Sequence, residues 1–505
     1  MAVDPKEARW AQLKDLCDEV LSKRRLILVS NRGPVEHQIT PDGRIEARRG
    51  SGGVVTALNS LGTMVEFAWV ASAIGEGDRK VSENSAGGRI RSPLPGQQIY
   101  LRYVVTPRRV YHRYYNVFCN PLLWFLQHYM WNSPYNPNLD ANVHEAWQDG
   151  YVEVNKAFAK AVIEEAQEAD NPPIIMVHDY HLYLVPEYTR NALPDSTIHH
   201  FTHIPWPSPR YWQLIPSYMI KKICEGLCAA DVVGFQTVHD VRNFLDTCAE
   251  FLPEAEIDYN TREIRRDGQR TQVRIYPISI SVDEIRRIAN SPRALDYERR
   301  LQPMCNEKTM IRVDRAEPSK NVVRGFKAYE LLLSRHPELQ GRVSFLAFLV
   351  PSRTHIRQYQ RYMDEIHHVI QNINSAFGTP EWQPVSTFIE NNYTQAIAGM
   401  KLYDVMLVNS VIDGMNLVAK EGPVVNDRGG VLILSETTGA YKQLSPGALA
   451  VSPSDIEGTM TAMYQALTMS DEERAQRAAT LAQIVEREDI LHWIICQLED
   501  IRSLI

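Results

Sequence analysis

Three basic side chains stand where they could bind phosphate groups. Arg315 and Lys320 lie five positions apart in a predicted loop between a strand and a helix, and Arg353 follows the next predicted strand. An arginine can donate two parallel hydrogen bonds to a phosphate, whereas a lysine supplies a point charge, so the pair suits a diphosphate. A solvated charged turn would also explain Arg315 and Lys320 alone. Three cations at successive strand ends of an acidic protein favour an anion-binding site.

A second candidate is the segment Asp413–Glu421, which connects a predicted buried strand, residues 404–408, to a short helix. A glycine-containing turn before a helix leaves backbone N–H groups and the positive end of the helix dipole facing outward, which suits a phosphate. Glu421 falls about two turns further on, where its carboxylate could accept hydrogen bonds from ribose hydroxyls. An ordinary connection with a surface acid would fit the same residues.

Polar residues also follow predicted strands in the first half of the chain. Arg32, Asp179 and His203 each come at or just after the carboxyl end of an apolar run. Ligands of open α/β sheets bind at that edge, so these side chains should face one crevice. The neighbouring histidines could suggest a metal site, but they lack the spacing of metal-binding motifs. Polar recognition of a sugar is the favoured interpretation.

Two further features could border a ligand. Most aromatic residues of the segment 111–131 should pack in the core, but Tyr115 and Trp124 could instead line a sugar site. Gly50 to Gly53 precede a predicted helix, and such a loop lets the backbone approach a ligand closely. A flexible turn would explain the glycines equally well.

Predicted strands and helices alternate along both halves of the chain, after a leading helix at 5–23. This alternation predicts parallel sheets, because crossover connections are right-handed. The fold class is therefore α/β, with two Rossmann-like domains, 1–283 and 284–486, that face each other across a cleft and a C-terminal helix, 487–505, that crosses back. In the family resemblance given below, the first would be the acceptor domain and the second the donor domain. The predicted strands are 26–30, 174–177, 197–202, 231–236, 271–280, 308–313, 343–350, 385–389, 404–408 and 430–434.

Length and composition are those of a soluble enzyme. A chain of 505 residues is too long for one core, which agrees with two domains. Without an apolar run that could span a bilayer or a signal-peptide pattern, a cytoplasmic protein is expected. A net charge of −7 argues against a general nucleic-acid binder. Seven scattered cysteines do not indicate a disulfide framework, and Cys224 and Cys228 should be packed thiols.

A set of short motifs occurs in order over nearly the whole chain. The motifs are Ser30-Asn31-Arg32, Gly50 to Gly53, Tyr114-Tyr115-Asn116, Leu123-Trp124, His178 to Leu182, His203-Ile204-Pro205, the pair Arg315 and Lys320, Pro351-Ser352-Arg353, and Asp413 to Glu421. With these motifs the chain resembles the trehalose-6-phosphate synthases, retaining GT-B glycosyltransferases of family 20. The resemblance implies a hexosyltransferase that moves glucose from UDP- or GDP-glucose to glucose 6-phosphate, giving α,α-trehalose 6-phosphate.

The resemblance also assigns the donor site. Arg315 and Lys320 would bind the diphosphate, Glu421 the ribose, and Asp413 and His203 the donor sugar. Backbone N–H groups of the loop would bind phosphate and glucosyl hydroxyls. The implied catalytic residues are Arg315, Lys320, Asp413 and His203, and the implied donor-binding residues are Gly53, Arg315, Lys320, Asp413, Met415, Asn416, Leu417, Val418 and Glu421.

The acceptor site implied by the resemblance comprises Arg32, Tyr115, Trp124, Asp179 and Arg353. The two arginines would bind the phosphate of glucose 6-phosphate, and Asp179 would contact acceptor hydroxyls. The reaction would use no metal, no other cofactor and no protein nucleophile, because the leaving phosphate accepts the proton and the cations stabilise its charge. The implied partners are these two substrates alone, with neither nucleic acid nor membrane, and a homo-oligomer is possible.

Some residues depart from the family pattern. Ala316-Glu317-Pro318 stands where the family usually has Leu-Asp-Tyr, residues 409–412 replace Thr-Pro-Leu-Arg, and Gly422-Pro423 should interrupt the helix early. These departures are similar to the pseudo-glycosyltransferases of the validoxylamine 7'-phosphate synthase type, which couple a nucleotide-cyclitol to an aminocyclitol phosphate. That activity, or glucosylglycerol-phosphate synthesis, is the alternative function.

Overall fold

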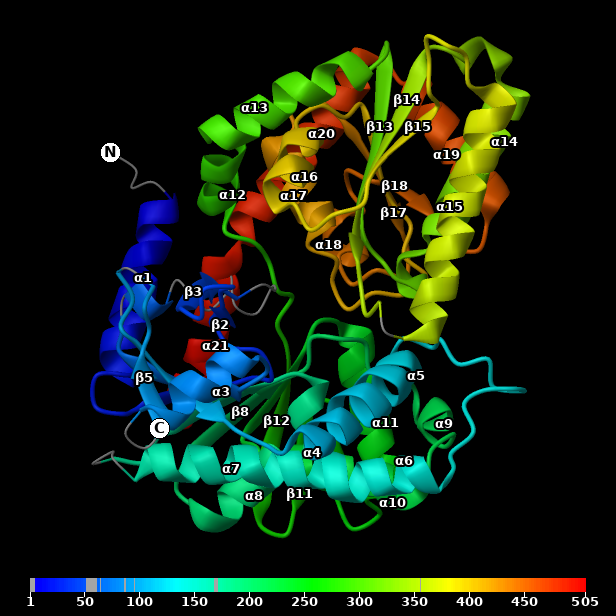
Figure 1. The fold of residues 1–505 in the computed structure, drawn as a ribbon. Coiled ribbons are helices and arrows are strands. Elements are labelled where there is room, and N and C mark those ends of the chain that lie inside the picture. The colour runs from blue at the N-terminus through cyan, green and yellow to red at the C-terminus, as the bar shows by residue number, and fades with distance from the viewer. Residues whose placement is uncertain are drawn as a thin grey trace. The chain divides into compact units, whose positions relative to one another are not determined.

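The computed structural model describes residues 5–50, 61–63, 65–85, 88–94, 96–167, 171–354 and 356–505. The chain divides into two compact units, each with its own central sheet (Figure 1). The first unit comprises Met1–Pro277 together with Leu491–Ile505, and the second comprises Ile278–Ile490.

The sheet of the first unit is parallel in its centre and antiparallel at its edges. Its strand order is β10-β11-β12-β9-β8-β7-β1-β4-β6-β5, and only β10, β11 and β5 join their neighbours in antiparallel pairs. The strands are β1 (Leu26–Val29), β4 (Phe67–Ser72), β5 (Arg89–Arg91), β6 (Ile99–Val104), β7 (Ile174–His178), β8 (Thr197–Phe201), β9 (Val232–Phe235), β10 (Glu256–Asp258), β11 (Glu263–Arg266) and β12 (Gln269–Ile275), with a separate hairpin of β2 (Val35–Ile39) and β3 (Ile45–Arg49).

Helices of the first unit connect these strands. They are α1 (Pro5–Val20), α3 (Glu76–Glu83), α4 (Arg108–His112), α5 (Phe125–Gln127), α6 (Ala141–Ala146), α7 (Glu153–Ala166), α8 (Val185–Ala192), α9 (Pro209–Trp212), α10 (Ser217–Leu227), α11 (Val238–Phe251) and α21 (Ile490–Arg502), with π-helical segments at Arg113–Trp124 and Trp147–Val152 and short 3-10 turns at Leu61–Thr63 and Tyr180–Leu182.

The second unit has an all-parallel sheet in the order β15-β14-β13-β16-β17-β18. Figure 1 shows α14, α15 and α19 on one side of this sheet and α16, α17 and α20 on the other. The elements are β13 (Lys308–Ala316), β14 (Val343–Pro351), β15 (Val385–Phe388), β16 (Val405–Val408), β17 (Val431–Ser435), β18 (Leu449–Val451), α12 (Val282–Ala289), α13 (Pro292–Leu301), α14 (Val322–Arg335), α15 (Arg357–Phe377), α16 (Tyr393–Met400), α17 (Val418–Val425), α18 (Tyr441–Leu444), α19 (Ile456–Thr468) and α20 (Asp471–Arg487), with 3-10 turns at Gln302–Met304, Pro318–Lys320 and Pro337–Leu339.

Most residues of the central strands are apolar because these strands are buried along their whole length. Every residue of β1, β7, β8, β9, β16 and β17 is buried. A parallel sheet has helices over both faces, so both sets of alternating side chains leave water. The exceptions are polar side chains that are buried as well, among them His178 of β7 and His199 and His200 of β8. The predicted strands therefore fall close to observed ones.

Three predictions of local structure are wrong. Strand β12 ends at Ile275 instead of residue 280, because Pro277 has no N–H for a ladder and the second unit begins at the next residue. Strand β13 continues to Ala316, so Arg315 belongs to a strand and not to a loop. Helix α17 passes through Pro423 and ends at Val425. Strands β2 to β6, β10, β11 and β18 are additional to the ten predicted strands.

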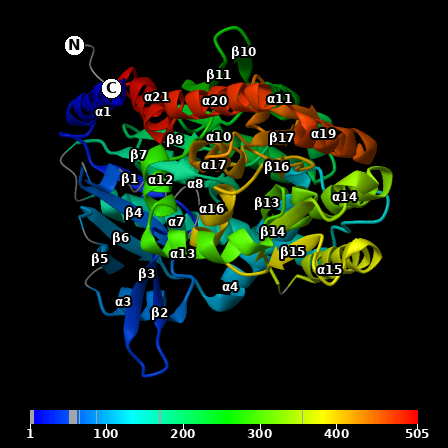
Figure 2. The ribbon, with the colours of Figure 1, turned by 90° about the horizontal axis from the view of Figure 1, so that it is seen from above.

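The C-terminal helix α21 packs in the first unit, beside α1 (Figure 2). Gln12 Nε2 donates to Glu499 Oε1 at 2.9 Å. Trp493 Nε1 donates to the carbonyl of Tyr276 at 3.2 Å, and the Tyr276 hydroxyl donates to Asp500 at 2.5 Å. The end of the chain thus packs against the residue that follows the carboxyl end of β12.

Other predictions concern cysteines and membrane spans. All seven cysteines are free thiols, and the packed thiols predicted at Cys224 and Cys228 are confirmed, since both are buried. Over the described ranges, no helix combines the length and the apolar character that crossing a membrane requires.

One charged side chain lies inside the sheet of the second unit. Arg312 of β13 is fully buried and donates to Asp314 Oδ2 from Nε at 3.0 Å and from Nη2 at 2.8 Å. Burial raises the pKa of Asp314, while Arg312 beside it acts to lower it. A buried ion pair is destabilising when one partner is lost, because the other charge stays desolvated.

We expect Arg312→Met to lower the free energy of unfolding by roughly 3 to 5 kcal/mol, because Asp314 would lose its counter-charge. The matched control is Arg342→Met, which breaks an ion pair with Glu307 whose two side chains are both 54% exposed, and it should change stability by less than about 0.5 kcal/mol. Denaturant unfolding followed by circular dichroism measures both. Equal stability of the two variants would contradict the expectation.

Candidate active site

Arg315 and Arg353 are connected through one buried carboxylate. They lie at the ends of the paired strands β13 and β14, where Arg315 is in register with Val350. Arg315 Nη2 is 2.8 Å from Glu317 Oε1, and Arg353 Nη1 is 3.6 Å from Glu317 Oε2. Glu317 is fully buried, whereas the Arg315 side chain is half exposed. The structure therefore brings two of the predicted cations together.

The third predicted cation, Lys320, pairs with Asp413. The Lys320 ammonium contacts Asp413 Oδ2, and the same oxygen accepts hydrogen bonds from Asn416 Nδ2 at 3.1 Å and from the Ser410 hydroxyl at 3.3 Å. Both members of the ion pair are largely buried. Two residues predicted to bind the donor substrate thus form an ion pair with each other. The Asp413 carboxylate is held by the Lys320 ammonium and by two hydrogen bonds.

Arg312 positions the loop that carries Lys320. Its Nη2 donates to the carbonyl of Lys320 at 3.1 Å and its Nη1 to that of Val322 at 3.2 Å. Asn321, at φ 58°, donates to the carbonyl of Asn409 at 2.8 Å. The sequence did not lead us to predict these roles. One signal was present: an arginine inside an otherwise apolar strand must have hydrogen-bond acceptors in the protein interior.

The loop before α17 is fixed by backbone contacts. Gly439 N donates to Asp413 O at 3.0 Å, and Ala440 N donates to Met415 O at 2.9 Å. A Cβ atom at Gly439 would lie 1.8 Å from the carbonyl oxygen of Gly414, so only glycine fits there.

The remaining loop residues lead into the helix. Asn416 has φ 74°, and its side chain accepts a hydrogen bond from Ala419 N at 3.2 Å, as a capping residue does. Met415 and Asn416 are buried, and Leu417 and Val418 are partly exposed. The predicted anion-binding turn exists, and its use in binding stays a prediction.

Glu421 lies in a dry environment. Its carboxylate accepts a hydrogen bond from the Tyr393 hydroxyl at 2.9 Å, and burial raises its pKa to about 7. The adjacent Lys420 donates to the carbonyl of Ile278 at 2.7 Å, and burial lowers its pKa to about 7. Desolvation disfavours the charged form of each group, so the two shifts have opposite signs and one cause.

In the first unit, Arg32 lies beyond β1 with its guanidinium half exposed and 3.6 Å from Glu36 Oε1. The preceding Asn31 is buried, and its Oδ1 accepts from the Ser72 hydroxyl and the Tyr114 hydroxyl, both at 3.1 Å. These bonds tie the end of β1 to β4 and to the aromatic segment. Arg32 therefore projects from a fixed backbone.

Tyr115 is one of three stacked rings. It is nearly parallel to Tyr111, with centroids 5.6 Å apart, and to His181, with centroids 5.9 Å apart. Trp124 is only 3% exposed and stacks on His128 at 4.0 Å between centroids. Tyr115 is partly exposed, as a contact with a sugar requires, whereas little of Trp124 is open to solvent.

Asp179 and His203 are adjacent at the ends of β7 and β8. Asp179 has φ 76°, and its Oδ1 accepts from the backbone N–H of His203 at 3.3 Å. His203 Nε2 lies 3.2 Å from Nδ1 of the buried His178. Trp493 of α21 packs near His203, with ring centroids 6.4 Å apart.

Gly53 lies outside the described residues, so its predicted role stays a prediction. Gly50 is described: it is buried, and its N–H donates to Pro34 O at 2.8 Å. The predicted residues that are described are divided between the two units. In the second unit they are Arg315, Lys320, Arg353, Asp413, Met415, Asn416, Leu417, Val418 and Glu421, and in the first Arg32, Tyr115, Trp124, Asp179 and His203.

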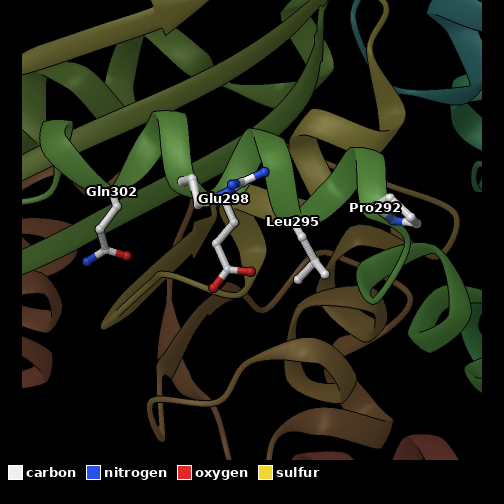
Figure 3. A pocket seen from close by; sticks show the side chains of 5 residues that line it. Pro292, Leu295, Glu298 and Gln302 are labelled. Carbon is white, nitrogen blue, oxygen red and sulfur yellow. The ribbon is translucent and has the colours of Figure 1, made fainter.

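Two other features were considered as sites. Among the residues that the structure describes, no group of three or more His, Cys, Asp or Glu side chains could hold a metal ion. A hollow of about 560 Å³ lies along α13, and the residues that line it, among them Leu295 and Glu298, come from that helix and from Gln302 directly after it (Figure 3). None of the predicted site residues that the structure describes lines it.

Two Rossmann-like units with largely parallel sheets and polar residues at the strand ends define an α/β protein whose ligands bind at those strand ends. The sequence profile of glycosyltransferase family 20 matches residues 24–503, and the chain belongs to that family. The predicted family and α/β fold class are thereby confirmed.

Relatives span nearly the whole chain. The α,α-trehalose-phosphate synthase [UDP-forming] 1 of Aspergillus fumigatus is 32% identical over 486 residues, which cover 94% of this chain and 89% of the relative. The UDP-forming enzyme of Schizosaccharomyces pombe is 30% identical over 495 residues, covering 95% and 91%.

Solved structures are similar over the same length. A trehalose-6-phosphate structure from E. coli bound with UDP-2-fluoro glucose has a TM-score of 0.80 at 28% identity, covering 95% of this chain and 99% of that one. The UDP-forming α,α-trehalose-phosphate synthase of Burkholderia xenovorans in complex with glucose-6-phosphate has a TM-score of 0.80 at 27% identity, covering 94% and 99%.

Buried histidines behind the site should make the protein sensitive to acid. Burial lowers the pKa of His178 and of His200 to about 3, and the pKa values of His199 and His203 are lowered as well. The unfolded chain, with histidine near 6.5, then binds more protons than the folded one. Each such group therefore lowers the free energy of unfolding by about 1.4 kcal/mol per pH unit as pH falls from 6.5 toward 3.

We expect His200→Leu to reduce the slope of stability against pH between 6.5 and 5 by up to about 1.4 kcal/mol per unit. The slope of each variant is compared with wild type, because Asp240, whose pKa burial raises to about 6, acts with the opposite sign in every variant. His367→Gln, at an exposed position of α15, is the control and should keep the wild-type slope. Denaturant unfolding at several pH values is the measurement, and an unchanged slope in His200→Leu would refute the assignment.

Proposed function

We propose that the protein transfers glucose from UDP-glucose to glucose 6-phosphate and releases UDP and α,α-trehalose 6-phosphate. The observation that carries the proposal is the match over 93–95% of the chain to trehalose-phosphate synthases named UDP-forming. The retained cations Arg315, Lys320 and Arg353 support it, because donor and acceptor are both phosphorylated.

In the proposed reaction, the bond between C1 of glucose and the β-phosphate oxygen breaks while the acceptor hydroxyl attacks C1. Arg315 and Lys320 stabilise the charge that develops on the departing diphosphate. Preorganised donors of this kind contribute about 2.7 to 4 kcal/mol each to a transition state. The leaving phosphate oxygen takes the proton of the acceptor hydroxyl, so the new bond forms on the same face and the configuration is retained.

The other residues hold the sugars. Asp413, fixed by Lys320 and Asn416, accepts hydrogen bonds from hydroxyls of the transferred glucose. Glu421 accepts from the ribose of UDP. In the first unit, Tyr115 and Asp179 contact glucose 6-phosphate. A carboxylate that is already oriented loses little conformational entropy when the sugar binds, which favours affinity.

Glucosylglycerol-phosphate synthesis and pseudo-glycosyl transfer are not favoured. Ala316, one of the departures from the family pattern, is fully buried and so faces the core. Glu317 pairs with two arginines that the synthases also use, so the altered segment keeps its cations. Metal independence, a cytoplasmic location and a homo-oligomeric state remain predictions.

The decisive experiment is to incubate the protein with UDP-glucose and glucose 6-phosphate and to identify the product by mass and anomeric linkage. We expect α,α-trehalose 6-phosphate. Arg315→Ala should reduce turnover by roughly two to three orders of magnitude, since the departing diphosphate loses a charged donor. Product from glycerol 3-phosphate or an aminocyclitol phosphate, with none from glucose 6-phosphate, would establish the alternative.

Excess chelator should leave turnover unchanged, because Arg315 and Lys320 provide the positive charge that magnesium provides in other phosphate-transferring sites. Initial rates before and after treatment with EDTA measure this. The control adds magnesium back to the treated protein. A complete loss of activity that magnesium restores would disprove metal independence. It would leave the proposed substrates unaffected.

A further inference from the structure

Glu317 is a buried acid at the point where β13 ends. Its side chain has no solvent exposure. Its N–H donates to Arg315 O at 2.8 Å, and its carbonyl accepts from Lys320 N at 3.0 Å, so its backbone is part of the tight turn. A buried carboxylate is strongly destabilising unless cations or hydrogen-bond donors compensate it. The partners of Glu317 must therefore explain why it is tolerated.

Both carboxylate oxygens face arginines. Oε1 is 2.8 Å from Arg315 Nη2, and Oε2 is 3.6 Å from Arg353 Nη1. The Ser352 hydroxyl donates to Oε2 at 3.5 Å. One acid thus bridges the ends of two adjacent strands. Two guanidinium groups at such close quarters would repel each other, and the shared negative charge reduces that repulsion.

Arg353 is held in a costly backbone conformation. Its φ is 45°, in the left-handed region that a residue with a Cβ occupies at a cost on the order of 1 kcal/mol. The guanidinium also contacts the Tyr359 hydroxyl and lies 5.4 Å from the centroid of that ring. The guanidinium of Arg353 is therefore oriented by Tyr359 and by Glu317, and of these two contacts the one with Glu317 is an ion pair.

We infer that Glu317 is a positioning residue that holds Arg315 and Arg353 in one ion-paired unit, so that a single acid sets the place of both the diphosphate and the acceptor phosphate. The inference rests on the proposed function, in which Arg315 binds the donor and Arg353 the acceptor. A guanidinium has five N–H donors, so each arginine can keep its ion pair with Glu317 while it binds a phosphate oxygen. Fixed donors bind more tightly because less side-chain entropy is lost.

The alternative effect of Glu317 is electrostatic and has the opposite sign. If the acid only reduced the positive potential, its removal would strengthen the binding of anions. If it positions the arginines, its removal weakens the binding of both anions, because the guanidinium groups separate. The sign of the change in affinity therefore distinguishes the two.

The test uses inorganic pyrophosphate and inorganic phosphate as probes, measured by calorimetry on the full chain. We expect Glu317→Gln to weaken the binding of both anions by roughly tenfold, which is the scale of one charge-assisted hydrogen bond. It should also raise the KM values of both UDP-glucose and glucose 6-phosphate, whereas Arg353→Ala should raise mainly that of glucose 6-phosphate. Glu307→Gln, which breaks an exposed ion pair with Arg342 in the same unit, is the matched control and should change neither affinity.

Tighter or unchanged binding of either anion by folded Glu317→Gln would overturn the inference, and so would a wild-type protein that binds neither anion. If Glu317→Gln does not fold, Glu317→Asp takes its place, because it keeps the charge but is one methylene shorter. We expect this variant to bind both anions more weakly than wild type, by a smaller factor. Wild-type affinities in that variant would also overturn the inference. Anion binding needs no sugar or base, so failure of the proposed function would appear in the product assay alone.

Discussion

The buried ion pair between Arg312 and Asp314 is the interaction on which the candidate donor site depends. Arg312 leaves solvent completely, so its N–H groups must find acceptors within the protein. It finds them in Asp314 and in the carbonyls of Lys320 and Val322. A strand, a loop and the start of a helix are thereby tied to one side chain. The loop that carries a predicted catalytic lysine owes its shape to a residue that need not touch the substrate.

The predicted cations are paired with acids of the protein itself. Lys320 contacts Asp413, and Arg315 and Arg353 share Glu317. Such pairing keeps the side chains in place and limits the repulsion between positive charges. Binding of a phosphate then adds bonds to groups that are already oriented, so the entropic cost of ordering long side chains is met during folding.

Much of the fold could be predicted because the parallel strands are apolar runs. The predicted strand 343–350 is β14, Val343–Pro351, and the positions of Arg315 and Arg353 near strand ends follow from the same pattern. The contacts could not be predicted, because they join distant residues: Arg312 reaches Asn409, 97 positions away. Glu317 drew attention only as a departure from a family pattern, since nothing in the order of residues says which cations a buried acid will meet.

Burial also decides how two ionisable residues of α17, one of them a predicted donor residue, behave near neutral pH. Glu421 and Lys420 are neighbours in α17, and desolvation moves the pKa of each to about 7 from opposite directions. A dry carboxylate competes less with water for the hydroxyls of a ribose, so each hydrogen bond to it is worth more. The same dryness makes the carboxylate harder to ionise, and its bond from Tyr393 acts to lower the pKa again. A ribose bound at Glu421, as predicted, would therefore be recognised by stronger hydrogen bonds from a carboxylate that is less readily charged, and the Tyr393 hydroxyl limits that loss of charge.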